Sequence, residues 1–114
     1  MFSLGLMLDR RHEIAEFEKQ IADMQQRLAS RGVTIEEKDY AAEAFGSWHI
    51  VAGTPKKKFD FSYEGKESYL RYRDAAVIPK DYHDFEHKSF RTWEGEDPLA
   101  YVEEVLRREF PDGT

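Results

Sequence analysis

Aromatic and polar residues alternate in the first half of one stretch, Lys56 to Asp74, which reads KKKFDFSYEGKESYLRYRD. Phe59, Phe61 and Tyr63 occupy every second position there. Successive side chains of a β-strand point to opposite faces of its sheet, so this alternation is typical of a strand with one buried face. The stretch constrains the fold more than any other, because another element must pack on its aromatic face and bury it.

A turn at Glu64-Gly65 joins this strand to a second one, since glycine suits the tight loop of a β-hairpin. A two-residue loop there predicts the pairs Tyr63 with Lys66, Phe61 with Ser68, Phe59 with Leu70, and Lys57 with Tyr72. Paired residues share a face of the sheet. One face then carries Phe59, Phe61, Tyr63, Leu70 and Tyr72. The opposite face carries Asp60, Ser62, Glu67, Tyr69 and Arg71.

A long amphipathic helix is predicted from about Asp9 to Ser30, with Gly32 as its stop signal. Its apolar stripe, spaced by three and four residues, consists of Ile14, Phe17, Ile21, Met24 and Leu28. We expect this stripe, through Ile14, Phe17 and Ile21, to cover Phe59, Phe61 and Leu70 of the hairpin. The same spacing also fits a heptad pattern, so a dimer formed through this helix is the alternative.

A second helix is predicted near the carboxyl end. Asp97 caps its free N–H groups and Pro98 suits the first helical position. Its buried stripe is Leu99, Val102, Leu106 and Phe110, with Val105 beside it. We expect this helix to pack on the same sheet face as the first one.

Other segments complete the sheet. Residues 47–53 (SWHIVAG) predict a strand with His49 and Val51 on the face opposite Trp48 and Ile50. Residues 34–45 favour a short helix, because Thr34 and the Glu three positions later match a capping box; an edge strand is the alternative. Residues 81–90 read as a loop leading into a fourth strand, or as a helical turn. The prediction is one α+β domain over residues 1–114, with a three- to four-stranded antiparallel sheet.

Charge and composition restrict the function classes. The net charge is −6, yet residues 55–80 carry seven positive and four negative side chains. Nucleic-acid binding is not expected, because an acidic chain neutralises phosphates poorly and the aromatic face should be buried. There is no cysteine, which excludes disulfides and thiolate chemistry. Residues 1–8 are apolar but too short for a membrane span, so we expect a cytoplasmic protein without a membrane segment.

Catalytic motifs are weak. No G-x-S-x-G, phosphate-binding loop or dinucleotide-binding glycine motif occurs, so neither an enzyme nor a cofactor is favoured. His83 and His87 are four residues apart and share a face on a helix or a strand, which suits a metal ion. No third ligand is evident for them, and a catalytic zinc ion usually needs three.

Two binding surfaces remain. The sheet face away from the helices offers His49, Asp60, Tyr69 and Arg71, and Tyr and Arg are frequent at binding hot spots. The alternative is a small-molecule cavity between sheet and helices, lined by Trp48, Phe59, Phe61, Tyr72, Phe90 and Trp93. We therefore predict a non-enzymatic interaction or accessory module that docks a protein partner or a second copy of itself, through this sheet face or an edge strand. A ligand-binding protein or enzyme that uses the aromatic cavity is the alternative.

Overall fold

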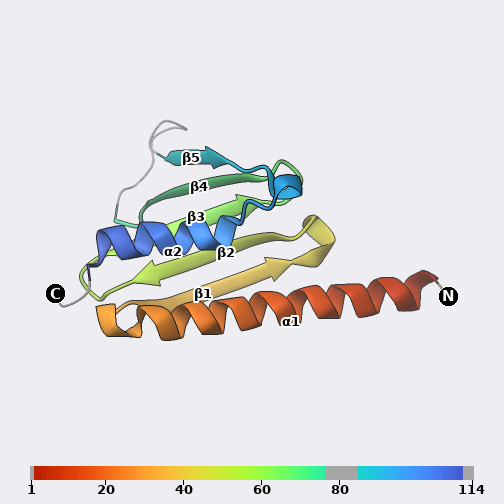
Figure 1. Cartoon of the computed structure of the whole chain (residues 1–114), viewed down its shortest axis with the longest axis horizontal. Coiled ribbons are helices and arrows are strands. Elements are labelled where there is room, and N and C mark those ends of the chain that lie inside the picture. Colours follow the sequence, from red (N-terminus) through yellow and green to blue (C-terminus); the bar gives the residue numbers. More distant parts are fainter. Residues whose placement is uncertain (1, 77–84, 112–114) are drawn as a thin grey trace.

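A computed structural model describes residues 2–76 and 85–111, with side chains from residue 11 onward. The elements are α1 (Phe2–Leu28), β1 (Thr34–Ala41), β2 (Ser47–Gly53), β3 (Lys58–Glu64), β4 (Tyr69–Asp74), β5 (Glu86–Ser89) and α2 (Pro98–Glu109), with short 3₁₀ turns at Ala29–Arg31, Ala42–Ala44 and Thr92–Glu94. The strands form one antiparallel sheet in the order β1-β2-β3-β4-β5. Both helices lie on one side of it (Figure 1). The α+β prediction is confirmed, but the sheet has five strands, not three or four.

The short helix predicted over residues 34–45 is wrong, because Thr34–Ala41 is an edge strand paired with β2. A β-bulge explains the misleading pattern: the register shifts between Ile35 and Glu37. Ile35 pairs with Ala52 and Tyr40 with Trp48, so Ile35 and Tyr40 both face the helices although they are an odd number of positions apart. The extra residue hides the strict alternation that would have indicated a strand.

The two-residue loop of the hairpin is also wrong. Residues 65–68 form a four-residue loop, and Phe61 pairs with Tyr72, not with Ser68. The error moves the pairing by four positions along β4, and only an odd shift exchanges the two faces of a strand. Phe61 and Leu70, both 0% exposed, therefore still share the buried face.

The helices divide the buried face between them. In α1, Phe17 contacts Tyr40 of β1 at 4.9 Å between ring centroids and Trp48 of β2 at 6.3 Å. In α2, Phe110 lies edge-on to Phe59 of β3 at 6.0 Å. The predicted stripe of α2 is buried throughout, whereas Ile14 of α1 is 37% exposed. Thus α1 covers the β1–β2 side of the sheet. Phe59, which we expected α1 to cover, is covered by α2.

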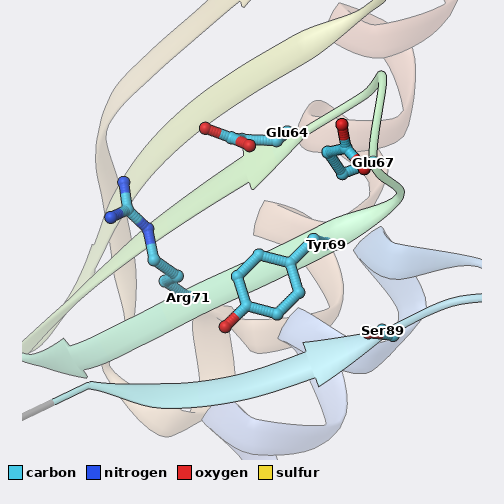
Figure 2. Close-up of a pocket in the computed structure, with 5 residues that line it drawn as sticks. All are labelled: Glu64, Glu67, Tyr69, Arg71 and Ser89. Carbon is cyan, nitrogen blue, oxygen red and sulfur yellow. The ribbon is translucent and has the colours of Figure 1, made fainter. Parts of the chain in front are cut away.

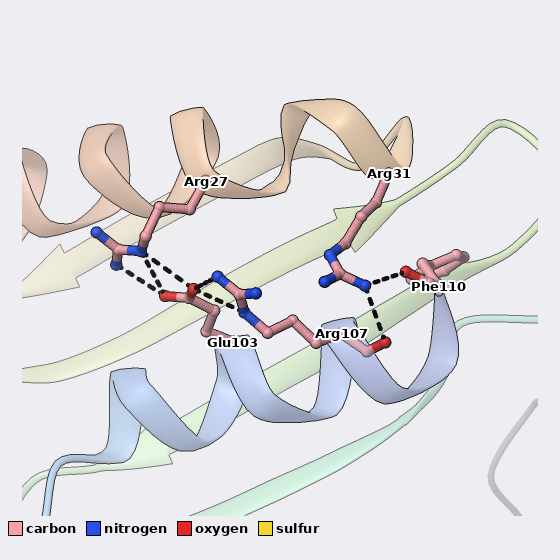
Figure 3. Close-up of polar contacts among 5 residues, drawn as sticks. All are labelled: Arg27, Arg31, Glu103, Arg107 and Phe110. Carbon is pink, nitrogen blue, oxygen red and sulfur yellow. Dashed lines mark hydrogen bonds and ion pairs between the residues drawn. The ribbon is translucent and has the colours of Figure 1, made fainter. Parts of the chain in front are cut away.

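An ion-pair cluster joins the two helices (Figure 3). Arg27 of α1 donates three hydrogen bonds of 2.7–3.0 Å to the carboxylate of Glu103 on α2, and Arg107 donates two more of 3.0 and 2.7 Å. Arg31 donates to the carbonyl oxygens of Arg107 and Phe110 at 3.4 and 3.1 Å, where α2 ends. These contacts hold α2 beside α1, with free carbonyl groups of the helix end satisfied.

Glu103→Gln is expected to lower the free energy of unfolding at pH 7 by about 1 kcal/mol, since the pairs are partly exposed. The hydrogen bonds from Arg27, more than those from Arg107, lower the pKa of Glu103 below its ordinary value. A carboxyl group with a lowered pKa stabilises the fold above its unfolded-state pKa and loses that contribution as the pH falls through the folded-state pKa. Urea unfolding at pH 7 and pH 3 should therefore show a smaller acid-induced loss in the variant. Glu104→Gln, at the exposed neighbouring position, should behave like wild type, and equal acid losses in all three proteins would contradict the prediction.

Candidate functional site

The sheet face away from the helices is not covered by any described element (Figure 1). We call it the outer face. The strand registers place on it Glu37, Asp39, His49, Asp60, Ser62, Glu64, Tyr69, Arg71, Arg73, His87 and Ser89. One row across all five strands reads Asp39, His49, Ser62, Arg71 and His87. The four residues predicted for partner binding, His49, Asp60, Tyr69 and Arg71, thus lie on one side of the sheet.

The centre of the outer face is occupied by side chains that pair with one another. His49 Nε2 lies 2.6 Å from Asp60 Oδ1, and His49 Nδ1 lies 4.0 Å from Glu37 Oε2. The second carboxylate oxygen of Asp60 lies 3.5 Å from Arg73 Nη2. These side chains are half-buried or at the strand edge, so the ladder ties β1, β2, β3 and β4 together.

The neighbourhood of Ser62, His49 and Asp60 resembles a catalytic triad only in composition. Ser62 pairs with His49 across the strands, but both ring nitrogens of His49 face carboxylates. A triad needs one ring nitrogen directed at the serine hydroxyl to accept its proton. The arrangement therefore ties strands together and provides no base for Ser62.

Tyr69 and His87 join β4 to β5 on the same face. The Tyr69 hydroxyl is hydrogen-bonded to Nδ1 of His87. Their rings stack with centroids 5.5 Å apart and planes 24° from parallel. The short fifth strand is thereby fixed to the sheet by side chains as well as by its backbone ladder.

Arg71 lies between two shallow hollows of the outer face. One, of about 400 Å³, is lined by Glu64, Glu67, Tyr69, Arg71 and Ser89 (Figure 2). The other, of about 390 Å³, lies toward Asp39 and His49 and shares Glu64 and Arg71 with the first. The Arg71 guanidinium lies 5.4 Å from the Phe85 ring centroid, and within the described residues no carboxylate comes close enough to pair with it. A half-buried arginine without an ion pair is available for a partner's carboxylate or carbonyl group.

Comparisons of the chain with protein-family models, curated proteins and solved structures gave no match. The outer face must therefore be interpreted from its own chemistry. It presents Arg71 between the two hollows, aromatic and histidine rings, and carboxylates on both sides. The hollows are shallow, so an extended protein surface fits them better than a small molecule does.

Five of the six aromatic residues predicted to line one cavity border three separate hollows. Trp48, Phe59, Phe61, Tyr72 and Phe90 are all buried in the core, whereas Trp93 is 77% exposed. Trp48 borders a crevice between the helices, Phe59 and Tyr72 border a second hollow, and Phe90 borders a third with Trp93. Burial, above all, raises the pKa of Tyr72 to about 12, so its hydroxyl stays neutral beside Tyr101.

Only one of the two histidines predicted to bind a metal ion lies within the described residues. His83 lies outside the described residues, and His87 is on the outer face. Over residues 2–76 and 85–111, no group of three or more His, Asp or Glu side chains is arranged to hold a metal ion. The site at His83 and His87 stays a prediction. In the same part of the chain, neither helix combines the length and the apolar character of a membrane span.

Sequence reasoning missed several members of the outer face. Arg73 follows Arg71 by two positions, so the parity of the strand gave a signal for it. The predicted two-residue loop places Glu64 in the turn, whereas β3 extends through Glu64. Ser89 could not be placed without the fifth strand, whose pairing with β4 depends on the tertiary structure.

Proposed function

We propose that the protein is a non-enzymatic interaction module whose outer face docks a second copy of the chain. The observation that carries the proposal is the distribution of charge across an uncovered sheet face. Glu37 and Asp39 lie on the edge strand β1, whereas Arg71 and Arg73 lie on β4 at the other side of the face. Arg71, on the basic side, has no carboxylate partner among the described residues.

Two-fold symmetry makes this gradient self-complementary. Homodimers usually have a two-fold axis, which brings the same patch of both copies together. An axis parallel to the strands and close to β3 places β1 of one copy over the β4–β5 side of the other. Asp39 then faces the region of Arg71 and His87 in the second copy, and the same contact occurs twice. Such charge arrangements fix the orientation of partners and speed their encounter.

The size of the face predicts a weak dimer. Five strands about 4.8 Å apart and about 20 Å long give roughly 500 Å² per copy, or about 1,000 Å² in total. This is the lower limit for a specific interface. We therefore expect a dimer that dissociates on dilution and at high salt, because exposed charges are screened within about 10 Å at 0.1 M salt.

Two charge reversals test the arrangement. Asp39→Arg alone gives a chain that is basic on both sides of the outer face, and Arg71→Asp alone gives one that is acidic on both sides. Each variant is expected to be monomeric at concentrations where wild type dimerises, whereas an equimolar mixture should form a heterodimer. The doubly substituted chain, with both changes, should dimerise again. Sedimentation equilibrium at several concentrations measures the mass of the two single variants, their mixture and the double variant. Native mass spectrometry identifies the heterodimer in the mixture.

Matched controls make the same charge changes away from the outer face. Lys56→Asp lies in the exposed turn before β3, and Glu104→Arg lies on the exposed side of α2. Both should dimerise like wild type. A wild-type mass that stays monomeric up to millimolar concentration contradicts the proposal. So does a dimer that survives both single reversals, because the contact would then lie elsewhere, for example at an edge strand.

A further inference from the structure

A crevice opens on the helix side of the sheet, between α1, the strands and the start of α2. Its volume is about 310 Å³. Its floor is formed by Phe17, Tyr40, Trp48, Tyr63 and Leu99. Phe17, Trp48 and Tyr63 keep 5–8% of their surface exposed, whereas Phe61 in the same core is 0% exposed. Solvent thus reaches the aromatic floor of the crevice, whose volume is at the lower end of the range for ligand pockets.

The rim of the crevice is acidic. Glu13 and Glu16 border it from α1, and Asp97 borders it from the start of α2. Among the described lining residues there is no lysine or arginine, and His12 is the one basic group. Burial, and then the charge of Glu13, raise the pKa of Tyr40, so this hydroxyl contributes no charge of its own. Carboxylates beside low-dielectric walls concentrate a negative potential in the opening.

The start of α2 does not counteract this potential by attracting anions. A helix N-terminus ordinarily favours negative charge through its free N–H groups. Here Asp97 already accepts a hydrogen bond from the Leu99 N–H at 3.0 Å, and Pro98 has no N–H. The helix end is therefore occupied by a carboxylate of the chain itself.

We propose that this crevice binds an amphipathic organic cation, a primary amine that carries an aryl group. The ring lies against the aromatic floor, and the ammonium group lies at the rim between Glu13 and Glu16. Aromatic faces attract cations as well as apolar surface, which adds to the charge interaction. This site goes beyond the docking of a second copy and is separate from it, because the crevice and the outer face lie on opposite sides of the sheet. Ligand binding and dimerisation can therefore be tested independently.

The test uses Trp48 as its own reporter. The chain has two tryptophans, and Trp93→Phe at a 77% exposed position leaves Trp48 as the fluorophore. Three probes of similar shape are titrated at pH 8: phenethylamine, 2-phenylethanol and phenylacetate. We expect a saturable change in Trp48 emission with the amine, at least tenfold weaker binding of the alcohol, and still weaker binding of the acid. Amide and ring chemical shifts of wild type, followed by NMR, provide the same ranking without any substitution.

Glu16→Gln tests whether the acidic rim binds the ammonium group. It removes one charge and keeps the size of the side chain, so amine binding should weaken by about five- to tenfold while binding of the alcohol stays the same. Glu18→Gln makes the same change on α1 outside the crevice and should leave all three affinities unchanged. The proposal is overturned if the acid binds as well as the amine, if none of the probes binds at millimolar concentration, or if Glu16→Gln and Glu18→Gln behave alike.

Discussion

Truncation of Phe61 to alanine is expected to lower the free energy of unfolding by about 3–5 kcal/mol. Phe61 lies on the central strand β3 and is 0% exposed. Its ring stacks on that of its cross-strand partner Tyr72 at 5.4 Å and lies 6.3 Å from Phe59. The neighbours close only part of the space that the ring leaves, because a packed core relaxes incompletely around a cavity. Urea unfolding monitored by circular dichroism measures the change.

Phe45→Ala is the matched control, since Phe45 is 70% exposed in the turn between β1 and β2. Its cost should stay below about 1 kcal/mol, because surface substitutions rarely exceed that. Both variants and wild type are compared at one protein concentration, since dimerisation adds to apparent stability. Similar losses for Phe61→Ala and Phe45→Ala would mean that β3 is not the centre of the core.

Local periodicity predicted those elements whose burial is regular. Strand β2 has the predicted range and helix α2 begins at the predicted Pro98, because each has one uninterrupted apolar face or stripe. The cap at Asp97 also agrees, since its side chain accepts from the Leu99 N–H. These features depend on neighbouring residues alone.

Pairing and layering were less predictable, because they depend on contacts between distant residues. The bulge at Glu36 breaks the alternation of β1, and its partner β2 determines that it is a strand. Likewise, Phe59 meets Phe110 of α2, which no local pattern specifies. The side of the sheet on which each residue lies was nevertheless predictable, because that property requires only the parity of its position within the strand.

The same distinction applies to the candidate sites. Alternation placed His49, Asp60, Tyr69 and Arg71 on one face, as the strand registers do. It gave no indication of the crevice, which needs Glu13 of α1 and the start of α2 to meet at one end of the sheet. A binding face can be read along a strand, whereas a crevice between elements appears only when the elements are packed.

Gly65→Ala is expected to lower the free energy of unfolding by about 2–3 kcal/mol, because an added methyl group has no room. The sequence predicts a tight hairpin loop at Gly65, where glycine ordinarily provides a positive φ, but positive φ in this loop occurs at Ser68 (49°). Gly65 is needed for space instead. A Cβ there would lie 1.8 Å from the carbonyl oxygen of Phe45 and 2.7 Å from its carbon, both backbone atoms of the β1–β2 turn. The Gly65 N–H also donates to Ser47 Oγ at 3.0 Å, so the two loops pack directly on each other.

Gly95→Ala separates this steric effect from backbone strain. Gly95 has φ of 89° and nothing within 4 Å of an added Cβ, so its cost is conformational and should be about 1 kcal/mol. The clash at Gly65 has to displace backbone, and Phe45 is itself held at φ 58°. Chemical shifts of Phe45, Gly46 and Ser47 should therefore change in Gly65→Ala and not in Gly95→Ala. A cost at Gly65 no larger than at Gly95, with the shifts of the β1–β2 turn unchanged, would show that the loops are not in contact. The length of the β3–β4 loop could then not be explained by its packing against the β1–β2 turn.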